Sequence, residues 1–264
     1  MYEASNECSG EGNLESVNKE NIRAGLRTLG LKKGDSVGVH SSLRSFGHVE
    51  GGADAVIDAL LEIVEQEGNI VMSTHSANLS EDRRTPEEIA IGVSWLFKLL
   101  PYDPKETPVR TGIIPETFRN RKGVVRGSHP SNSIAALGPN AKELSEGWHR
   151  LLERDGYILL IGVGLEGCTA MHLAEKCVQL PERILEKITP PHWLIEKYPE
   201  GEWEWDFGPY PDFAKLTNPC IERGIMKTLK VGEATLELVK LRELIDLFYD
   251  KSYKQGASAE PDKI

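Results

Sequence analysis

Residues 157–175 read YILLIGVGLEGCTAMHLAE, and this stretch decides the fold. Its first five residues, Tyr157–Ile161, form a continuous apolar run that predicts a buried strand. The glycines that follow end the strand. Residues 169–175 have the composition of a helix start, for which Thr169 is a candidate cap. A strand, a glycine turn and a helix in this order are typical of α/β proteins.

The same stretch carries a candidate for chemistry. His172 and Glu175 are three residues apart, so on a helix they share one face and the carboxylate can orient the imidazole. An imidazole held in this way at a strand-to-helix junction is typical of a general base. The alternative is an ordinary glycine turn followed by an amphipathic helix with a polar stripe.

The rest of the N-terminal half alternates in the same manner. Apolar spacing predicts helices over residues 17–30 and 55–65, and short apolar runs predict strands over 36–40 and 69–73. We therefore expect an α/β fold with a central mixed sheet flanked by helices, at least part of it parallel.

The second half is less regular. Residues 80–108 are charged and punctuated by proline, and predict an inserted helical segment that forms a lid or a cleft wall. Residues 113–119 begin like a helix with proline in its first turn. Residues 201–207 alternate acidic and aromatic residues like a half-covered strand, and 231–249 predict mostly helix.

We expect one domain over residues 1–264, with residues 1–14 as a disordered leader.

The net charge of -10 argues against nucleic acid as a partner. It favours a cationic substrate; the alternative is that the charge serves only to keep the protein soluble. No long apolar run indicates a membrane span or a signal peptide. The four cysteines are scattered, which argues against a structural metal or disulfides and favours the cytoplasm; Cys168 and Cys177 are expected to be packing residues.

A second chemical segment, residues 40–52, reads HSSLRSFGHVEGG and joins a predicted strand to a predicted helix. The free backbone N–H groups of such a helix start can bind an anion. The spacing matches neither a Walker A loop nor a dinucleotide fingerprint, so an ordinary nucleotide site is disfavoured. The alternative is a plain glycine-rich loop with serine caps.

Five blocks of this chain, in this order, resemble the aminoglycoside 3-N-acetyltransferase family: residues 40–53, 110–119, 126–138, 169–175 and 231–247. The resemblance implies transfer of acetyl from acetyl-CoA to the 3-amine of the deoxystreptamine ring of an aminoglycoside, with antibiotic resistance as the result. Since a neutral amine can attack the thioester itself, no covalent acyl-enzyme is required, and we expect direct transfer in a ternary complex without a metal. The resemblance also implies a fold distinct from the GNAT acetyltransferases, with smaller β elements beside the main sheet.

The resemblance places the catalytic histidine at His172, as general base. Glu175 then holds its tautomer, and the Thr169 hydroxyl is a candidate donor to the oxyanion. The first three blocks imply a coenzyme site formed by Ser41, Ser42, Leu43, Phe46, Arg110, Thr111, Gly112 and Ser128.

Glu166, His129 and His75 are candidate substrate contacts. The family usually has aspartate where this chain has Glu166, and often asparagine where it has Cys168. Further acidic candidates for a polycationic sugar are Glu81, Asp82, Glu87, Glu88, Glu202, Glu204 and Asp206.

Three alternatives stay open at this point. The enzyme acetylates a different small amine, or it is a serine hydrolase that uses Ser41 or Ser42 with His172. The chain has no Gly-x-Ser-x-Gly elbow, which weakens the hydrolase. The third is a non-catalytic module that sequesters cationic molecules. The sequence leaves the oligomeric state open.

Overall fold

The computed structural model describes residues 16–76, 82–176, 182–208 and 212–256. Its main sheet has seven strands: β1 (Ser36–Ser41), β2 (Asn69–Ser73), β4 (Val125–Arg126), β5 (Ile134–Leu137), β6 (Tyr157–Ile161), β8 (Met226–Val231) and β9 (Ala234–Lys240). They lie in the order β4-β5-β2-β1-β6-β9-β8.

The centre of this sheet is parallel and its flanks are antiparallel. β1 pairs in parallel with β2 on one side and with β6 on the other. The β2–β5, β4–β5, β6–β9 and β8–β9 pairs are antiparallel. The expected mixed sheet is therefore confirmed, and its three central strands end at the same edge.

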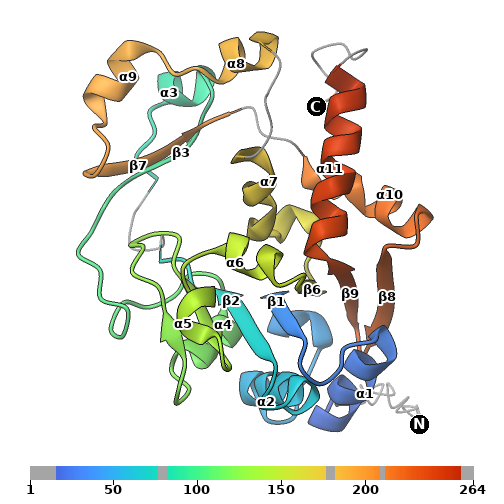
Figure 1. The fold of residues 1–264 in the computed structure, drawn as a ribbon. Coiled ribbons are helices and arrows are strands. Elements are labelled where there is room, and N and C mark those ends of the chain that lie inside the picture. Colours follow the sequence, from blue (N-terminus) through green and yellow to red (C-terminus); the bar gives the residue numbers. More distant parts are fainter. Residues whose placement is uncertain (1–15, 77–81, 177–181, 209–211, 257–264) are drawn as a thin grey trace, which may run out of the picture.

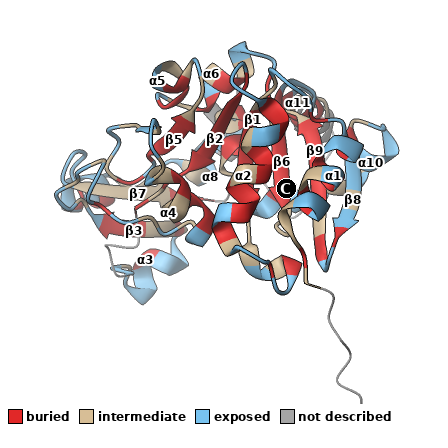
Figure 2. Cartoon of the chain, turned by 90° about the horizontal axis from the view of Figure 1, so that it is seen from below, coloured by how far each residue is buried: buried red, intermediate tan, exposed pale blue. Residues whose placement is uncertain are grey.

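Helices cover both faces of the sheet, because successive residues of a strand point to opposite sides. Val37 and Val39 of β1 pack in one core cluster, and Ile158 and Leu160 of β6 pack in another. The first cluster is covered by α1 (Lys19–Leu29), α2 (Gly52–Val64) and α4 (Ile113–Arg119). The second is covered by α5 (Ala141–Leu144), α6 (Trp148–Glu153), α7 (His172–Lys176), α10 (Thr217–Glu222) and α11 (Leu241–Gly256). Figure 2 shows the buried sheet between its helices.

A smaller unit lies beyond the main sheet, at the upper left of Figure 1. Its antiparallel strands are β3 (Val93–Lys98) and β7 (Trp203–Phe207), and its helices are α3 (Pro86–Ala90), α8 (Glu182–Ile188) and α9 (His192–Lys197). Leu194, Tyr198 and Phe207 belong to its separate apolar core. The buried Glu88 carboxylate accepts hydrogen bonds from Lys197 and Tyr198, both at 2.6 Å, and ties α3 to α9.

Two expectations for the irregular segments were wrong in detail. Residues 231–249 begin with a strand: Gly232 turns the chain at a φ of +57°, β9 runs to Lys240, and the helix begins only at Leu241. The apolar patch within residues 80–108 forms strand β3, because its backbone pairs with β7 and its Val93 and Leu96 pack in one apolar core with Leu194 of α9. The strand expected over 201–207 is confirmed as β7. Residues 1–14 and Cys177 lie outside the described residues.

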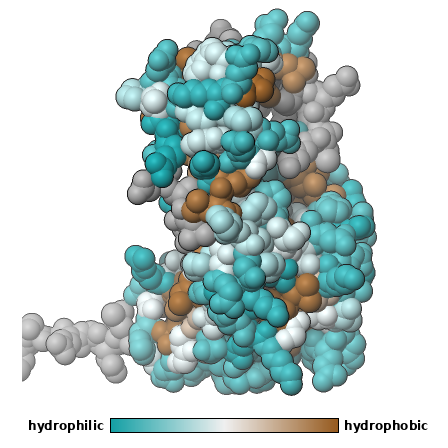
Figure 3. Space-filling view, turned by 90° about the vertical axis from the view of Figure 1, so that its left-hand side faces the viewer, coloured by the Kyte–Doolittle hydropathy of each residue, from teal (hydrophilic) through white to brown (hydrophobic). Residues whose placement is uncertain are grey.

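The described residues contain no helix long and apolar enough to cross a membrane. The face shown in Figure 3 is mostly hydrophilic, with apolar side chains in small separate groups.

Gly162, directly after β6, has a φ of +60°, and a Cβ atom there would lie 1.8 Å from Ser45 Oγ. Gly224 has a similar φ of +68° with nothing within 4 Å. We expect Gly224→Ala to lower the free energy of unfolding by about 1 kcal/mol, from the backbone alone. Gly162→Ala also has the clash, so its loss should be about 3 kcal/mol. Urea denaturation measures both, and equal losses would contradict the close contact of Gly162 with Ser45.

Candidate active site

The carboxyl ends of the three parallel strands bring distant segments together. The Ser42 amide, just after β1, donates to the carbonyl of Ile161 at the end of β6, at 2.9 Å. The hydroxyl of Thr111, just before α4, donates to the carbonyl of Ser73 at the end of β2, at 2.5 Å. In open α/β sheets, ligands bind at this edge of the strands.

His172 and Glu175 form the side-chain contact that their spacing predicts. His172 Nδ1 lies 2.9 Å from Glu175 Oε2 within α7. The imidazole is 51% exposed, whereas the Glu175 side chain is only 16% exposed. The imidazole and the Phe213 ring pack in a T-shaped arrangement, with centroids 5.7 Å apart. A carboxylate on Nδ1 fixes the tautomer and leaves Nε2 as the nitrogen for chemistry.

Thr169 does not cap a helix, contrary to our expectation. A short 3-10 turn, Thr169–Met171, precedes α7, and its cap position is Cys168, which makes no side-chain cap. The Thr169 hydroxyl instead lies 2.7 Å from the hydroxyl of Ser73. Ser73 was not among the expected site residues, because a single serine at the end of an apolar strand belongs to no motif.

Two further histidines lie beside this edge: His40 is buried and His75 is half-buried. The pKa of His75 is lowered to about 4, chiefly by burial of the ring and to a smaller extent by the nearby His172 and His129. Burial also lowers the pKa of His40 to about 3, with a smaller effect from His75. His40 packs on the Trp148 ring, with centroids 5.2 Å apart. Both imidazoles are therefore neutral at pH 7.

His129 lies in an exposed loop before β5. Its Nδ1 accepts hydrogen bonds from the amides of Asn132 and Ser131, at 3.1 and 3.3 Å. Two N–H donors on one nitrogen leave the proton on Nε2. The Glu204 carboxylate of β7 accepts hydrogen bonds from the side-chain amide of Asn132, at 2.6 Å, and from the Ser131 hydroxyl. The smaller unit is thus bonded to the loop that carries His129.

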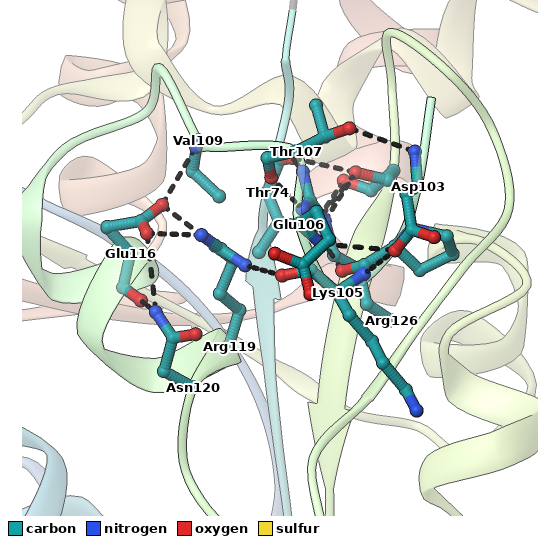
Figure 4. Close-up of polar contacts among 12 residues, drawn as sticks. Thr74, Asp103, Lys105, Glu106, Thr107, Val109, Glu116, Arg119, Asn120 and Arg126 are labelled. Carbon is teal, nitrogen blue, oxygen red and sulfur yellow. Dashed lines mark hydrogen bonds and ion pairs between the residues drawn. The ribbon is translucent and has the colours of Figure 1, made fainter. Parts of the chain in front are cut away.

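Figure 4 shows how the segment before α4 is held. The Arg126 guanidinium donates to the carbonyls of Thr74, at 2.7 Å, and Thr107. Burial lowers the pKa of Arg126 from its usual value. Glu116 accepts from the Val109 amide at 2.8 Å and pairs with the Arg119 guanidinium.

This network fixes the residues that follow it in the chain. The amide of Arg110 donates to the carbonyl of His75 at 2.7 Å, so Arg110, Thr111 and Gly112 lie at the edge where β2 ends. The Arg110 side chain is exposed.

The coenzyme candidates divide into two groups. Ser42 and Leu43 are half-buried, and Ser128 is exposed, so their side chains are accessible at the surface. Phe46 is 1% exposed and packs in the first core cluster, so it supports the fold and we leave it out of the proposed site. Ser41 Oγ is buried and has no hydrogen-bond partner among the described residues. No base is therefore positioned on it, as a hydrolase would require.

The acidic residues proposed as substrate contacts differ in exposure and in hydrogen-bond partners. Glu166 is exposed, and its Oε1 accepts from the Gly164 amide at 3.2 Å. Burial raises the pKa of the neighbouring Glu237, and the charge of Glu166 adds to this. Glu88 is used inside the smaller unit, and Asp206 accepts from the indole of Trp95. Glu81 lies outside the described residues.

The two cysteines in the part of the chain that the structure describes, Cys168 and Cys220, are buried. Burial raises the pKa of the Cys168 thiol to about 12, so Cys168 is a protonated packing residue, as expected. No group of three or more metal-ligating side chains is present among the described residues.

The buried His40 predicts a pH dependence of stability. The unfolded chain protonates His40 below about pH 6.5, whereas the folded chain keeps it neutral down to about pH 3. Falling pH therefore favours the unfolded state. Between pH 7 and pH 5, the free energy of unfolding should fall by about 2 kcal/mol more in the wild type than in His40→Gln.

Urea titrations at each pH measure this difference. The control is the step from pH 7 to pH 8, where both proteins should change equally. The same pH dependence in both down to pH 5 would contradict a neutral, buried His40.

Three comparisons place this geometry among known proteins. Residues 39–251 match the family profile described as aminoglycoside 3-N-acetyltransferase. The chain is 32% identical over 257 residues to an SPbeta prophage-derived aminoglycoside N(3')-acetyltransferase-like protein, YokD, of Bacillus subtilis (strain 168). The match covers 86% of this chain and 89% of that protein.

Two solved structures share the fold. One is aminoglycoside acetyltransferase AAC(3)-IVa in complex with apramycin, with a TM-score of 0.73 and 24% identity, covering 94% of this chain and 99% of that chain. The other is AAC-IIIb in a binary complex with CoASH, with a TM-score of 0.70 and 21% identity, covering 94% and 100%. The expected fold, distinct from that of the GNAT enzymes, is confirmed. The chain belongs to the aminoglycoside 3-N-acetyltransferase family.

Proposed function

We propose that this protein transfers the acetyl group of acetyl-CoA to the 3-amino group of the 2-deoxystreptamine ring of an aminoglycoside, directly in a ternary complex. One observation carries the proposal. The imidazole of His172 is half-exposed at the carboxyl edge of the sheet, and the nearly buried Glu175 carboxylate lies 2.9 Å from its Nδ1. That arrangement suits a general base.

Membership of the family supports acetyl transfer as the reaction. The solved structures support acetyl-CoA and an aminoglycoside as its two reactants. AAC-IIIb binds CoASH, and AAC(3)-IVa binds apramycin. The net charge of -10 suits a polycationic substrate. Acetylation would abolish the positive charge of one amine, and antibiotic resistance is the expected result. Because acetyl-CoA is an intracellular metabolite, we place the reaction in the cytoplasm, and we treat the whole chain as one catalytic domain.

The chemistry follows from the need for a neutral nucleophile. The neutral 3-amine attacks the thioester carbonyl, a C–N bond forms, and Nε2 of His172 takes the proton that the amine loses. Glu175 stabilises the resulting imidazolium through Nδ1. The C–S bond then breaks, and the coenzyme A thiolate takes the proton that His172 holds. Coenzyme A leaves as the thiol, and His172 returns to its neutral form. No covalent acyl-enzyme is needed.

The remaining contacts of the proposal come from the same edge. The Thr169 hydroxyl donates to the oxyanion of the tetrahedral intermediate. The coenzyme lies along residues 41–43 and 110–112, with Ser128 beside it. Backbone N–H groups at the start of α2 offer donors to its pyrophosphate. Glu166, His129 and His75 contact the sugar, with Glu204 close to His129.

His172→Ala should lower kcat by about 100- to 10,000-fold, because the proton acceptor is lost. Affinity for acetyl-CoA should stay unchanged in a thermal-shift titration, since the coenzyme residues are intact. A matched control is His192→Ala in α9. His192 also lies near a glutamate, 3.3 Å from Glu196, but belongs to the smaller unit and is highly exposed. Full activity of His172→Ala would overturn its role as base.

The proposed reaction itself is tested by a panel of aminoglycosides with acetyl-CoA and a thiol-release readout. We expect release with 2-deoxystreptamine aminoglycosides that carry a free 3-amine and none with their 3-N-acetyl forms. Initial rates should give intersecting double-reciprocal lines, whereas parallel lines would indicate a covalent intermediate. Release only with other small amines would contradict the proposed substrate.

A further inference from the structure

We infer that Ser73 is a positioning residue for acetyl transfer: its hydroxyl donates to Thr169 Oγ1 and directs the Thr169 hydrogen toward the reacting carbonyl. The inference rests on the proposed function, in which Thr169 donates to the oxyanion. It adds a residue that lies outside the five blocks of family resemblance.

The two hydroxyls come from segments 96 residues apart and lie 2.7 Å from each other. Ser73 is the last residue of β2 and is 3% exposed, whereas Thr169 is half-buried. Among the described residues, each hydroxyl is the other's one hydrogen-bond partner. No further hydrogen bond from the described part of the chain sets the direction of this contact, so the direction depends on the surroundings of each oxygen.

Burial sets that direction. A hydroxyl has one hydrogen to donate and two lone pairs that accept. If Thr169 donated to Ser73, the hydrogen of Ser73 would be buried with no acceptor among the described residues, which is unfavourable. If Ser73 donates to Thr169, both hydroxyls are satisfied, because the half-buried Thr169 can donate to water or to a ligand. The second arrangement presents a donor to the site.

The surrounding backbone holds Ser73 in place for this role. Ser73 pairs with Ile134 in the β2–β5 ladder, and its carbonyl accepts from the Thr111 hydroxyl at 2.5 Å. Thr111 belongs to the segment proposed to hold the coenzyme, so one residue joins that segment to the oxyanion donor. A hydrogen bond received at Oγ1 also polarises the Thr169 O–H and strengthens its donation.

A double-mutant cycle of Ser73→Ala, Thr169→Val and the double variant tests the inference. We expect Thr169→Val to lower kcat by about 100-fold, as the loss of an oxyanion donor does. Ser73→Ala should lower kcat by about tenfold, the equivalent of one neutral hydrogen bond, with KM for acetyl-CoA unchanged. In the Thr169→Val background, Ser73→Ala should cause no further loss, because Ser73 acts through Thr169.

Ser36→Ala is the matched control. Ser36 starts β1 at the opposite end of the sheet, and its hydroxyl accepts from the Asn69 side chain at 2.9 Å. Removal of this hydroxyl should leave kcat unchanged. Thermal melting of each variant separates a loss of folded protein from a loss of rate.

The possible outcomes separate the positioning role of Ser73 from the proposed role of Thr169 as oxyanion donor. If Thr169→Val keeps full kcat, the oxyanion role of Thr169 is wrong and the inference is overturned with it. If Thr169→Val is slow but Ser73→Ala is fully active, or the two losses multiply, only the inference is overturned. A loss in Ser73→Ala that disappears in the Thr169→Val background supports it.

Discussion

The parallel pairing of β1 with β2 and β6 is the constraint on which the rest of the structure depends. Parallel strands end at the same edge of a sheet. The chain must then return along a face of the sheet, usually through a helix, before the next parallel strand begins. That edge therefore collects Ser41, Ser73 and Ile161 together with the segments that follow them. The antiparallel strands extend the sheet on either side, and the smaller unit is bonded to the same edge through Glu204.

The histidines at this edge differ in charge state and in exposure. The His40 imidazole is buried, the His75 imidazole is half-buried, and both are neutral, whereas the His172–Glu175 pair lies at the surface. This arrangement suits a substrate that carries several ammonium groups, because a protonated His75 beside His172 would repel it. The two neutral imidazoles keep the edge polar without adding positive charge. The same neutrality lowers stability in acid, which is the thermodynamic cost of burying them.

The sequence predicted the parts that local patterns encode. Apolar runs placed β1, β2 and β6, and the three-residue spacing in α7 correctly paired His172 with Glu175. It failed where tertiary contacts decide. A stripe of apolar residues before Leu241 fits a helix or a buried strand, and pairing with β6 and β8 selected the strand. The Ser73–Thr169 contact joins residues 96 positions apart, so no local pattern reveals it.

Chemical rescue of His172→Ala by imidazole tests most directly whether His172 takes the proton from the amine. A small base that diffuses into the space left by the side chain can replace a missing general base, but it cannot replace a residue that only supports the fold. With acetyl-CoA and an aminoglycoside, added imidazole should restore thiol release in His172→Ala in proportion to its neutral form. It should not affect Thr169→Val. The absence of rescue in a folded variant that still binds both reactants would contradict the account.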